Sequence, residues 1–144
     1  MLDARHLTAL EALVGPAGLA SDPAAYETPA RYARGVAAAV ARPATTAEVS
    51  AVVGYCAREG LAFVPQGANT GLVEGSTPDA SGQQLVLSLD RLTAPMEIDA
   101  ADRTATVGAG ARLSALNAAL EPHGLFLPID LGADPSLGLS LIHI

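Results

Sequence analysis

One stretch of twelve residues combines bare backbone with small polar side chains. It is PQGANTGLVEGS, residues 65–76, which holds Gly67, Gly71 and Gly75 and the short donors Asn69, Thr70 and Ser76. Glycine tolerates a positive φ and lets a ligand come close to backbone N–H groups. Successive N–H groups that point into one concavity bind an anion such as a diphosphate. The stretch predicts an anion-binding loop, and the alternative is a plain surface loop built from turn residues.

Two well-known glycine motifs do not fit this loop. A P-loop requires Gly-Lys-Ser/Thr, which is missing here. The helix-dimer motif GxxxG requires an apolar 20-mer, whereas this stretch carries Pro, Gln, Asn, Thr and Glu.

A second glycine pair lies in TVGAGARL, residues 106–113, and imitates a dinucleotide-binding fingerprint. It follows a predicted strand, opens a predicted helix, and has Asp130 roughly 20 residues further on. Leu113 stands where the third glycine belongs. The alternative is that Gly108 and Gly110 simply form the turn between strand and helix.

No arrangement of acids, histidines or cysteine predicts a catalytic or metal site. The carboxylates show no telling spacing, and His6 and His123 are isolated in the sequence. His123 near a helix C-terminus favours a capping role. The single cysteine, Cys56, excludes an internal disulfide and a cysteine-rich metal site, and a helical pattern makes it a buried small hydrophobe.

Charge and composition limit the kinds of partner that the protein can bind. Eight basic residues stand against fifteen acidic ones, for a net charge of −7, which disfavours nucleic acid and anionic membrane surfaces. Half of the 144 residues are apolar, enough for one domain with an aliphatic core. We find no signal peptide and no run approaching the ~18 apolar residues of a membrane span, so we expect a cytoplasmic protein.

The elements that position the loop follow from periodicity. Residues 1–14 predict an amphipathic helix, and residues 15–34 a connector. A strand is expected within 35–43, then a helix that begins after Thr45 with a capping box and ends at Gly60, then a strand at 61–65. Strand, helix and strand in this order predict a βαβ unit with parallel strands. The loop then follows the carboxyl end of a strand, where open α/β sheets bind ligands.

The second half of the chain predicts further short elements. We expect a strand at 85–90, a hairpin of 96–99 with 104–110, and a helix over 112–124. A short strand at 125–128 then runs into a loop that ends near residue 136.

The order of these motifs resembles a known family. The residues GVAAAVARPATTAEVSAVVGYCAREGLAFVPQGANTGLVEGSTP, VLSLDRL, EID, RTATVGAGARLSALN and PIDLGADPSLG look like the FAD-linked oxidase superfamily of the vanillyl-alcohol-oxidase type. Within it, PQGxNTGxVxGSxP and PIDLGA look most like the D-2-hydroxy acid dehydrogenases that act on hydroxyglutarate, D-lactate or glycolate. The resemblance runs from about Arg34 to Gly138.

The resemblance implies a fold, a cofactor and site residues. The fold would be α+β, a PCMH-type FAD-binding domain of two α/β subdomains, incomplete here, over residues 35–138 after an N-terminal helix and connector at 1–34. FAD would contact two segments of the chain: Pro65, Gln66, Gly67, Ala68, Asn69, Thr70, Gly71, Gly75 and Ser76, and then Pro128, Asp130, Leu131, Gly132, Asp134 and Ser136.

Three comparisons with the family pattern bear on the site. The family usually has glycine where this chain has Ala68 and Glu74. Ala68 would cost about 1 kcal/mol if its position needed a positive φ, and Glu74 would repel a diphosphate unless its carboxylate points to solvent. Relatives that attach FAD covalently here use a histidine at the place of Asn69, so non-covalent FAD is expected.

The resemblance also suggests an FAD-dependent oxidoreductase acting on CH–OH groups, of which this chain is the N-terminal FAD-binding portion. The substrate-binding residues, catalytic base and metal ligands of the family would lie beyond it. Two alternatives remain: a nicotinamide-binding half-domain built on GAGARL, and a non-catalytic anion-binding module. Residues 139–144, LSLIHI, depart from the family pattern and equal the translation of a sequencing adaptor, CTGTCTCTTATACACATC, so we expect a non-native tail rather than a buried strand.

Overall fold

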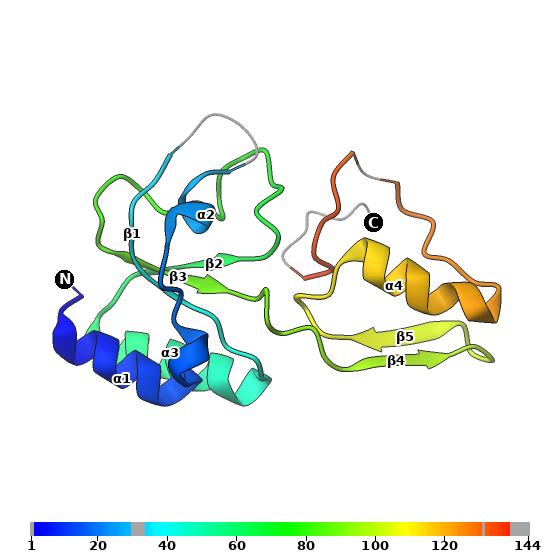
Figure 1. Cartoon of the computed structure of the whole chain (residues 1–144), viewed down its shortest axis with the longest axis horizontal. Helices are drawn as coiled ribbons and strands as arrows, with labels where there is room; N and C mark the ends of the chain where they lie inside the picture. The colour runs from blue at the N-terminus through cyan, green and yellow to red at the C-terminus, as the bar shows by residue number, and fades with distance from the viewer. Residues whose placement is uncertain (1, 30–33, 131, 139–144) are drawn as a thin grey trace.

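The computed structural model describes residues 2–29, 34–130 and 132–138, and forms two lobes connected by the segment at residues 89–95 (Figure 1). The first lobe holds a three-stranded parallel sheet, and the second holds an antiparallel hairpin with a helix. The predicted α+β class is confirmed. Among the described residues, no helix has both the length and the apolar character that crossing a membrane requires. The predicted tail at 139–144 lies outside the described residues.

The two long helices of the first lobe begin and end where capping residues stand. Helix α1 covers Ala4–Val14, and Asp3 caps it by accepting from the His6 N–H. Helix α3 covers Thr46–Glu59, and Thr45 caps it by accepting from the Glu48 N–H. The Glu48 carboxylate reaches back to the Ala44 N–H, one residue before the expected position. Gly60 ends α3 at φ 65°, in the left-handed region that favours glycine.

The sheet consists of β1 (Ala37–Ala41), β2 (Phe63–Gln66) and β3 (Gln84–Ser88), in the order β1–β3–β2. All pairings are parallel, as the βαβ pattern predicted. However, β1 and β2 are not neighbours, because β3 inserts between them. The central place of β3 also explains its burial: Leu85, Val86, Leu87 and Ser88 are all buried, so both faces of the strand are covered.

Alternate residues of the sheet face two different layers. Leu85 and Leu87 pack with Leu10 and Val14 of α1 and with Val52 and Cys56 of α3 in the main core. Cys56 is buried there as a small hydrophobe, as predicted. Gln66, Val86 and Ser88 alternate with these residues and point to the other face, which short helix α2 (Ala24–Glu27) and the residue 67–83 connection cover (Figure 1).

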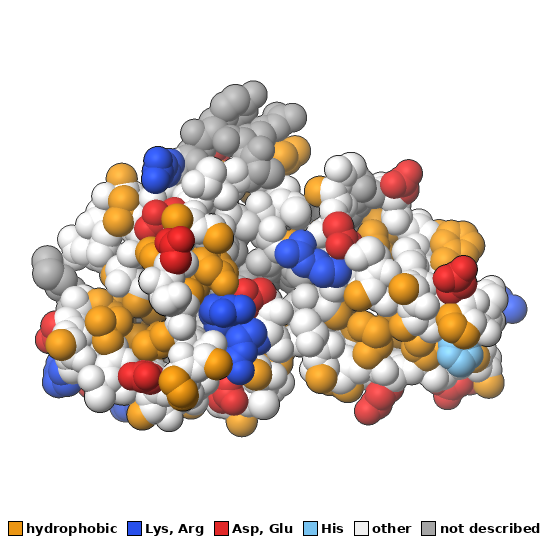
Figure 2. Space-filling view, in the orientation of Figure 1, with side chains coloured by type: hydrophobic (Ala, Val, Ile, Leu, Met, Phe, Trp, Pro, Cys, Tyr) orange, Lys and Arg blue, Asp and Glu red, His pale blue; other side chains and the backbone are white. Residues whose placement is uncertain are grey.

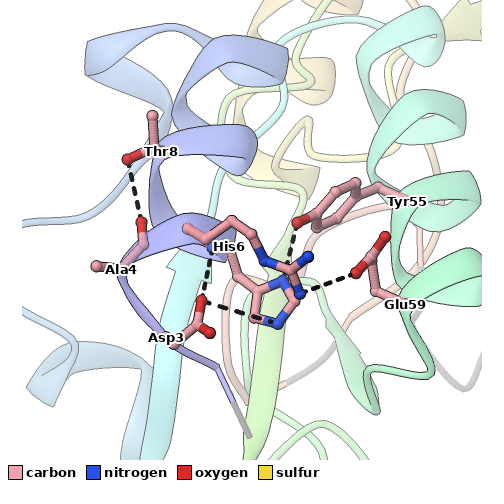
Figure 3. A network of polar contacts seen from close by, with 7 residues as sticks. Asp3, Ala4, His6, Thr8, Tyr55 and Glu59 are labelled. Atoms are coloured by element: carbon pink, nitrogen blue, oxygen red, sulfur yellow. Dashed lines mark hydrogen bonds and ion pairs between the residues drawn. The ribbon is translucent and has the colours of Figure 1, made fainter.

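A polar pair also joins the two helices of the main core (Figure 3). His6 is buried, and its Nδ1 lies 2.8 Å from the Tyr55 hydroxyl on α3. The rings meet edge to face, with centroids 6.0 Å apart. Arg5 and Glu59 add an ion pair of 3.3 Å nearby. Helix α1 is therefore held against the core both by apolar packing and by polar contacts.

The connector after α1 is more ordered than its composition predicts. It contains the 3₁₀ turn η1 (Pro16–Gly18) as well as α2. Residues between these turns line the free edge of β1, since the Ala20 N–H donates to the Val40 carbonyl and the Arg42 N–H donates to the Gly18 carbonyl. The outer edge of β1 is thus covered at its carboxyl end by the chain itself.

The second lobe consists of β4 (Met96–Asp99), β5 (Thr104–Val107), α4 (Leu113–Leu120) and the turn η2 (Glu121–His123). The predicted hairpin is confirmed, and so is the helix, although α4 ends early and η2 completes it. The predicted strand at 125–128 is wrong. The Leu127 N–H donates to the Asn117 side chain on α4, and Pro128 has no N–H, so this segment has little to offer a neighbouring strand.

Candidate cofactor-binding site

The glycine-rich loop leaves β2 at the carboxyl edge of the parallel sheet. Residues 67–76 start directly after Gln66, while Arg42 and Asp90 follow the ends of β1 and β3. Carboxyl ends of parallel strands lie at one edge of a sheet, where ligands of such sheets bind. The loop also faces the second lobe, and Figure 1 shows it beside the gap between the two lobes.

The backbone of this loop keeps most of its donors open. The Ala68 N–H donates to the Ser136 Oγ at 3.0 Å. Among the described residues, the N–H groups of residues 69–73 have no protein acceptor. A Cβ added at Gly71 or Gly75 would meet no atom within 4 Å. Open donors beside free space are what a bound anion requires.

The left-handed positions of the loop are not its glycines. Asn69 has φ 55° and Glu74 has φ 61°, whereas Gly71 and Gly75 lie outside this region. Here the glycines give access to the backbone rather than positive φ. The expected cost at Ala68 does not arise, since its φ is not positive. Glu74 occupies a conformation that favours glycine, which fits the glycine of the family pattern at this place.

Three polar side chains predicted to contact FAD bond to the protein instead. Both bonds from Gln66 Nε2 go to carbonyls, of Tyr26 at 2.9 Å and of Ser76 at 2.7 Å. Asn69 Nδ2 donates to the Thr28 carbonyl at 3.0 Å, and Asn69 Oδ1 accepts from the Ser76 hydroxyl at 2.9 Å. Their contacts with FAD stay a prediction, whereas the Thr70 hydroxyl has no partner among the described residues.

The second predicted segment meets the loop at Ser136. This residue is buried, and its hydroxyl accepts from the Ala68 N–H and donates to the Gly138 carbonyl at 2.8 Å. Ser136 also pairs with Arg112, and Leu137 and Gly138 donate to the Ala111 and Ala109 carbonyls. The structure thereby brings residues 68 and 136 together across the two lobes.

Asp134 caps helix α4 from outside the helix. Its carboxylate accepts from the Ser114 N–H at 2.9 Å and from the Ser114 hydroxyl at 2.7 Å. The Ser114 N–H holds the pKa of Asp134 below its ordinary value. Arg112 donates to the Asp134 carbonyl, so the turn before α4 and this loop support each other.

The remaining predicted residues make fewer contacts. Pro65 lies in edge strand β2, where its missing N–H costs no ladder bond. Pro128, Asp130 and Gly132 are exposed, and the Asp130 carboxylate has no partner among the described residues. Gly67 is half-buried at the start of the loop. Leu131 lies outside the described residues.

Sequence analysis missed a polar cluster at the same sheet edge. The Tyr26 hydroxyl donates to Asp90 at 2.8 Å, and Arg42 Nε contacts both Asp90 oxygens at 3.0 and 3.1 Å. Burial, followed by the Asp90 hydrogen bond, raises the pKa of Tyr26 to about 12. No sequence signal was available, because these three residues lie far apart in the chain. Figure 2 shows arginine side chains on both sides of the junction between the lobes.

The second glycine pair serves packing. A Cβ on Gly110 would lie 1.8 Å from the Leu89 carbonyl oxygen, and one on Gly108 would lie 2.4 Å from the Leu92 oxygen. Both glycine N–H groups donate to this segment, from Gly108 to Pro95 and from Gly110 to Leu92. The preceding strand is half of an antiparallel hairpin, not a parallel strand. The turn interpretation is therefore confirmed, and the nicotinamide half-domain is not supported.

A model of the family described as "FAD binding domain" matches residues 37–140. The chain belongs to this family. The match confirms the resemblance to FAD-linked oxidases. It covers the sheet, the glycine-rich loop and the second lobe, and it starts after α1 and α2.

Named proteins and a solved structure are similar to parts of this chain. D-2-hydroxyglutarate dehydrogenase of Xanthomonas citri pv. viticola is 42% identical over 101 residues, which are 70% of this chain and 21% of the relative. The mitochondrial D-2-hydroxyglutarate dehydrogenase of Bos taurus is 37% identical over 134 residues, 90% of this chain and 24% of the relative. The chain thus spans less than a quarter of these relatives. Alkyldihydroxyacetonephosphate synthase matches the fold with a TM-score of 0.74 at 17% identity, over 86% of this chain and 26% of that one.

The loop fits FAD in its chemistry. FAD carries a diphosphate, and residues 69–73 supply open N–H donors with free space at Gly71 and Gly75. Within the described part of the chain, no group of three or more His, Cys, Asp or Glu side chains could hold a metal ion.

Proposed function

We propose that this chain is the FAD-binding portion of an FAD-dependent D-2-hydroxy acid dehydrogenase of the hydroxyglutarate, lactate or glycolate type. One observation carries the proposal: the N–H groups of residues 69–73 lack acceptors among the described residues and lie beside open space at the carboxyl edge of a parallel sheet. The relatives named as D-2-hydroxyglutarate dehydrogenases support the substrate class.

In this proposal the described residues bind and orient the cofactor. Backbone donors of residues 69–73 and the Thr70 hydroxyl would hold the diphosphate, and Ser136 would keep the loop against the second lobe. Bound FAD supplies hydride acceptance from the carbon that bears the hydroxyl group. In this proposal, substrate binding and proton transfer would be performed by residues outside this chain.

We further propose that the FAD is held without a covalent bond at this loop. Asn69 stands where covalently flavinylated relatives carry a histidine. Its carboxamide is engaged at both ends, to the Thr28 carbonyl and the Ser76 hydroxyl. Acid precipitation of the holoenzyme should release the flavin into the supernatant. Flavin that stays in the protein pellet would contradict this.

The test of the proposed function is spectroscopic and uses the full-length enzyme. We expect absorption bands at roughly 375 and 450 nm, which belong to the flavin cofactor. Anaerobic addition of D-2-hydroxyglutarate, D-lactate or glycolate should bleach the longer-wavelength band for one of them, and the L-enantiomer of a chiral substrate is the matched control. Absence of flavin would refute cofactor binding. Flavin without bleaching by any of the three acids would refute the substrate class alone, whereas the anion-binding alternative is favoured only if flavin is absent.

Two smaller expectations accompany this proposal. Residues 1–144 alone should turn over neither D-lactate nor D-2-hydroxyglutarate, because they span less than a quarter of the named relatives. The cytoplasmic location stays a prediction, and the bovine relative is named as mitochondrial. Fractionation of the source cells, followed by detection of the enzyme, tests it.

A further inference from the structure

Two side chains join the glycine-rich loop to the backbone of the N-terminal segment, and a third supports one of them from within the loop. Gln66 and Asn69 donate to the carbonyls of Tyr26 and Thr28, and Ser76 links the far end of the loop to Asn69. We call these three side chains and two carbonyls the loop clamp. It closes residues 66–76 into a ring, because Gln66 also donates to the Ser76 carbonyl.

Burial shows that the clamp is part of the fold. Gln66 is 1% exposed, so its carboxamide must find partners inside the protein. Both of the bonds it donates are made, and both go to backbone carbonyls that no side-chain substitution can remove. Asn69 holds a left-handed backbone at φ 55°, a conformation that asparagine tolerates better than most residues. Its two side-chain bonds hold that conformation in place.

The segment that receives the clamp is itself anchored. The Tyr26 hydroxyl donates to Asp90 beyond β3. The Glu27 carbonyl accepts from Gly35, and its carboxylate accepts from the Ala37 N–H at the start of β1. The carbonyls at residues 26 and 28 are therefore fixed relative to the sheet, and they can hold the loop in one position.

We propose that Gln66, Asn69 and Ser76 are positioning residues that clamp the FAD loop to residues 26–28, so that cofactor affinity depends on an N-terminal segment preceding the family-matched region at residue 37. This inference rests on the proposed function. A loop fixed before binding loses less conformational freedom when the ligand arrives, and its open N–H groups already share one direction. The side chains of Asn69 and Ser76 then act through the backbone and not as direct ligands of FAD.

A double-mutant cycle on the full-length enzyme separates these two roles. Asn69→Gly keeps the left-handed backbone accessible and removes both side-chain bonds, and Ser76→Ala removes one of the same bonds. We expect the FAD dissociation constant to rise about fivefold for Ser76→Ala and about 30-fold for Asn69→Gly, from one and two ordinary hydrogen bonds. Because Asn69 and Ser76 share one hydrogen bond, the FAD dissociation constant of the double variant should also be about 30-fold above that of the wild type.

The control and the second readout are independent of catalysis. Ser81→Ala makes the same chemical change in the same β2–β3 connection, where Ser81 Oγ accepts from the Gln83 N–H, and it should leave FAD affinity unchanged. Hydrogen exchange of the cofactor-free enzyme should become faster in peptides covering both 67–76 and 24–29 in Asn69→Gly. Faster exchange in the second peptide reports the clamp itself, since Thr28 accepts from Asn69.

A double variant about 150-fold weaker, the product of the single effects, would overturn the clamp, because each side chain would then contact FAD on its own. Unchanged affinity and unchanged exchange in Asn69→Gly would overturn it as well. If the wild-type enzyme binds no FAD, the proposed function is wrong, and hydrogen exchange alone tests the loop clamp. Unchanged protection in Asn69→Gly would then contradict the clamp, and faster exchange in both peptides would support it.

Discussion

Replacing Gly71 by valine should abolish tight FAD binding while leaving the fold intact. Gly71 is exposed, and a Cβ placed on it meets no atom of the described residues within 4 Å. Its backbone is not left-handed, so a β-branched residue can adopt the same conformation. The side chain would enter only the space that the proposed diphosphate occupies, beside the open N–H groups of residues 69–73.

The magnitude follows from the donors that valine would cover. Hydrogen bonds to a charged group contribute about 2 kcal/mol each. If valine keeps the phosphate from two of the five N–H groups, the loss is about 4 kcal/mol, or roughly a thousandfold in the dissociation constant. Stability should change by no more than about 0.5 kcal/mol, as for other surface substitutions without special contacts.

Gly110→Ala is the matched control with the opposite expectation. Its new Cβ would lie 1.8 Å from the Leu89 carbonyl oxygen and 2.8 Å from the Leu89 carbonyl carbon, so backbone must move. We expect a loss of about 3 kcal/mol in the free energy of unfolding, at the upper end for overpacking. Two glycines of similar appearance in the sequence should thus separate into one needed for ligand access and one needed for packing.

The assays are flavin fluorescence quenching for affinity and urea unfolding of the cofactor-free enzyme for stability. Gly71→Val with normal FAD affinity would refute the reasoning, since no ligand could then lie against this backbone. Gly71→Val that loses stability as much as Gly110→Ala would also refute it, because the affinity loss would then report unfolding.

Three further predictions concern other parts of the chain. Tyr55→Phe should lower the free energy of unfolding by about 1 kcal/mol, because buried His6 loses its partner, while Thr8→Ala on the exposed side of α1 should change it by about 0.3 kcal/mol or less in urea titrations. Ser114 lowers the pKa of Asp134, so the stability that this cap contributes is present above the ordinary pKa of 3.8 and is lost as pH falls through the lower pKa of the folded protein. Asp134→Asn should therefore flatten the acid limb of a curve of unfolding free energy against pH, and an unaltered limb would contradict this. Genomic DNA amplified across codon 138 should not encode LSLIHI followed by a stop, and finding that sequence would show the tail to be native.

Local signals predicted most of the elements because they rest on neighbouring residues. Thr45 and Glu48 predicted where α3 begins, and Gly60 where it ends, since capping depends on backbone groups within four positions. The hairpin around residues 100–103 followed from turn chemistry in the same way. The central place of β3 could not be predicted, because strand order depends on which surfaces pack together over long sequence distances.

Composition predicted the loop as an anion-binding site, but it did not predict the hydrogen bonds that the loop's own side chains make. Nothing in the spacing of Gln66 and Tyr26 reveals that one donates to the backbone of the other. Asn69 and Ser76 were predicted to donate to a ligand, yet their side chains form a hydrogen bond with each other. The strand expected at 125–128 failed for a related reason: its apolar residues suit a strand, but Asn117 on α4 takes the N–H of Leu127.

The position of β3 constrains the order in which this protein can be made. When residues 37–66 have left the ribosome, the segments of β1 and β2 have been synthesised but have no strand to pair with, because each pairs with β3 and not with the other. Unpaired strands of this kind are exposed to wrong pairing until the missing strand arrives. The glycine-rich loop lies between β2 and β3, so its second end becomes fixed only after Ser88 has been synthesised. We therefore predict that FAD binds this lobe after the sheet has closed and does not act as an early template for it.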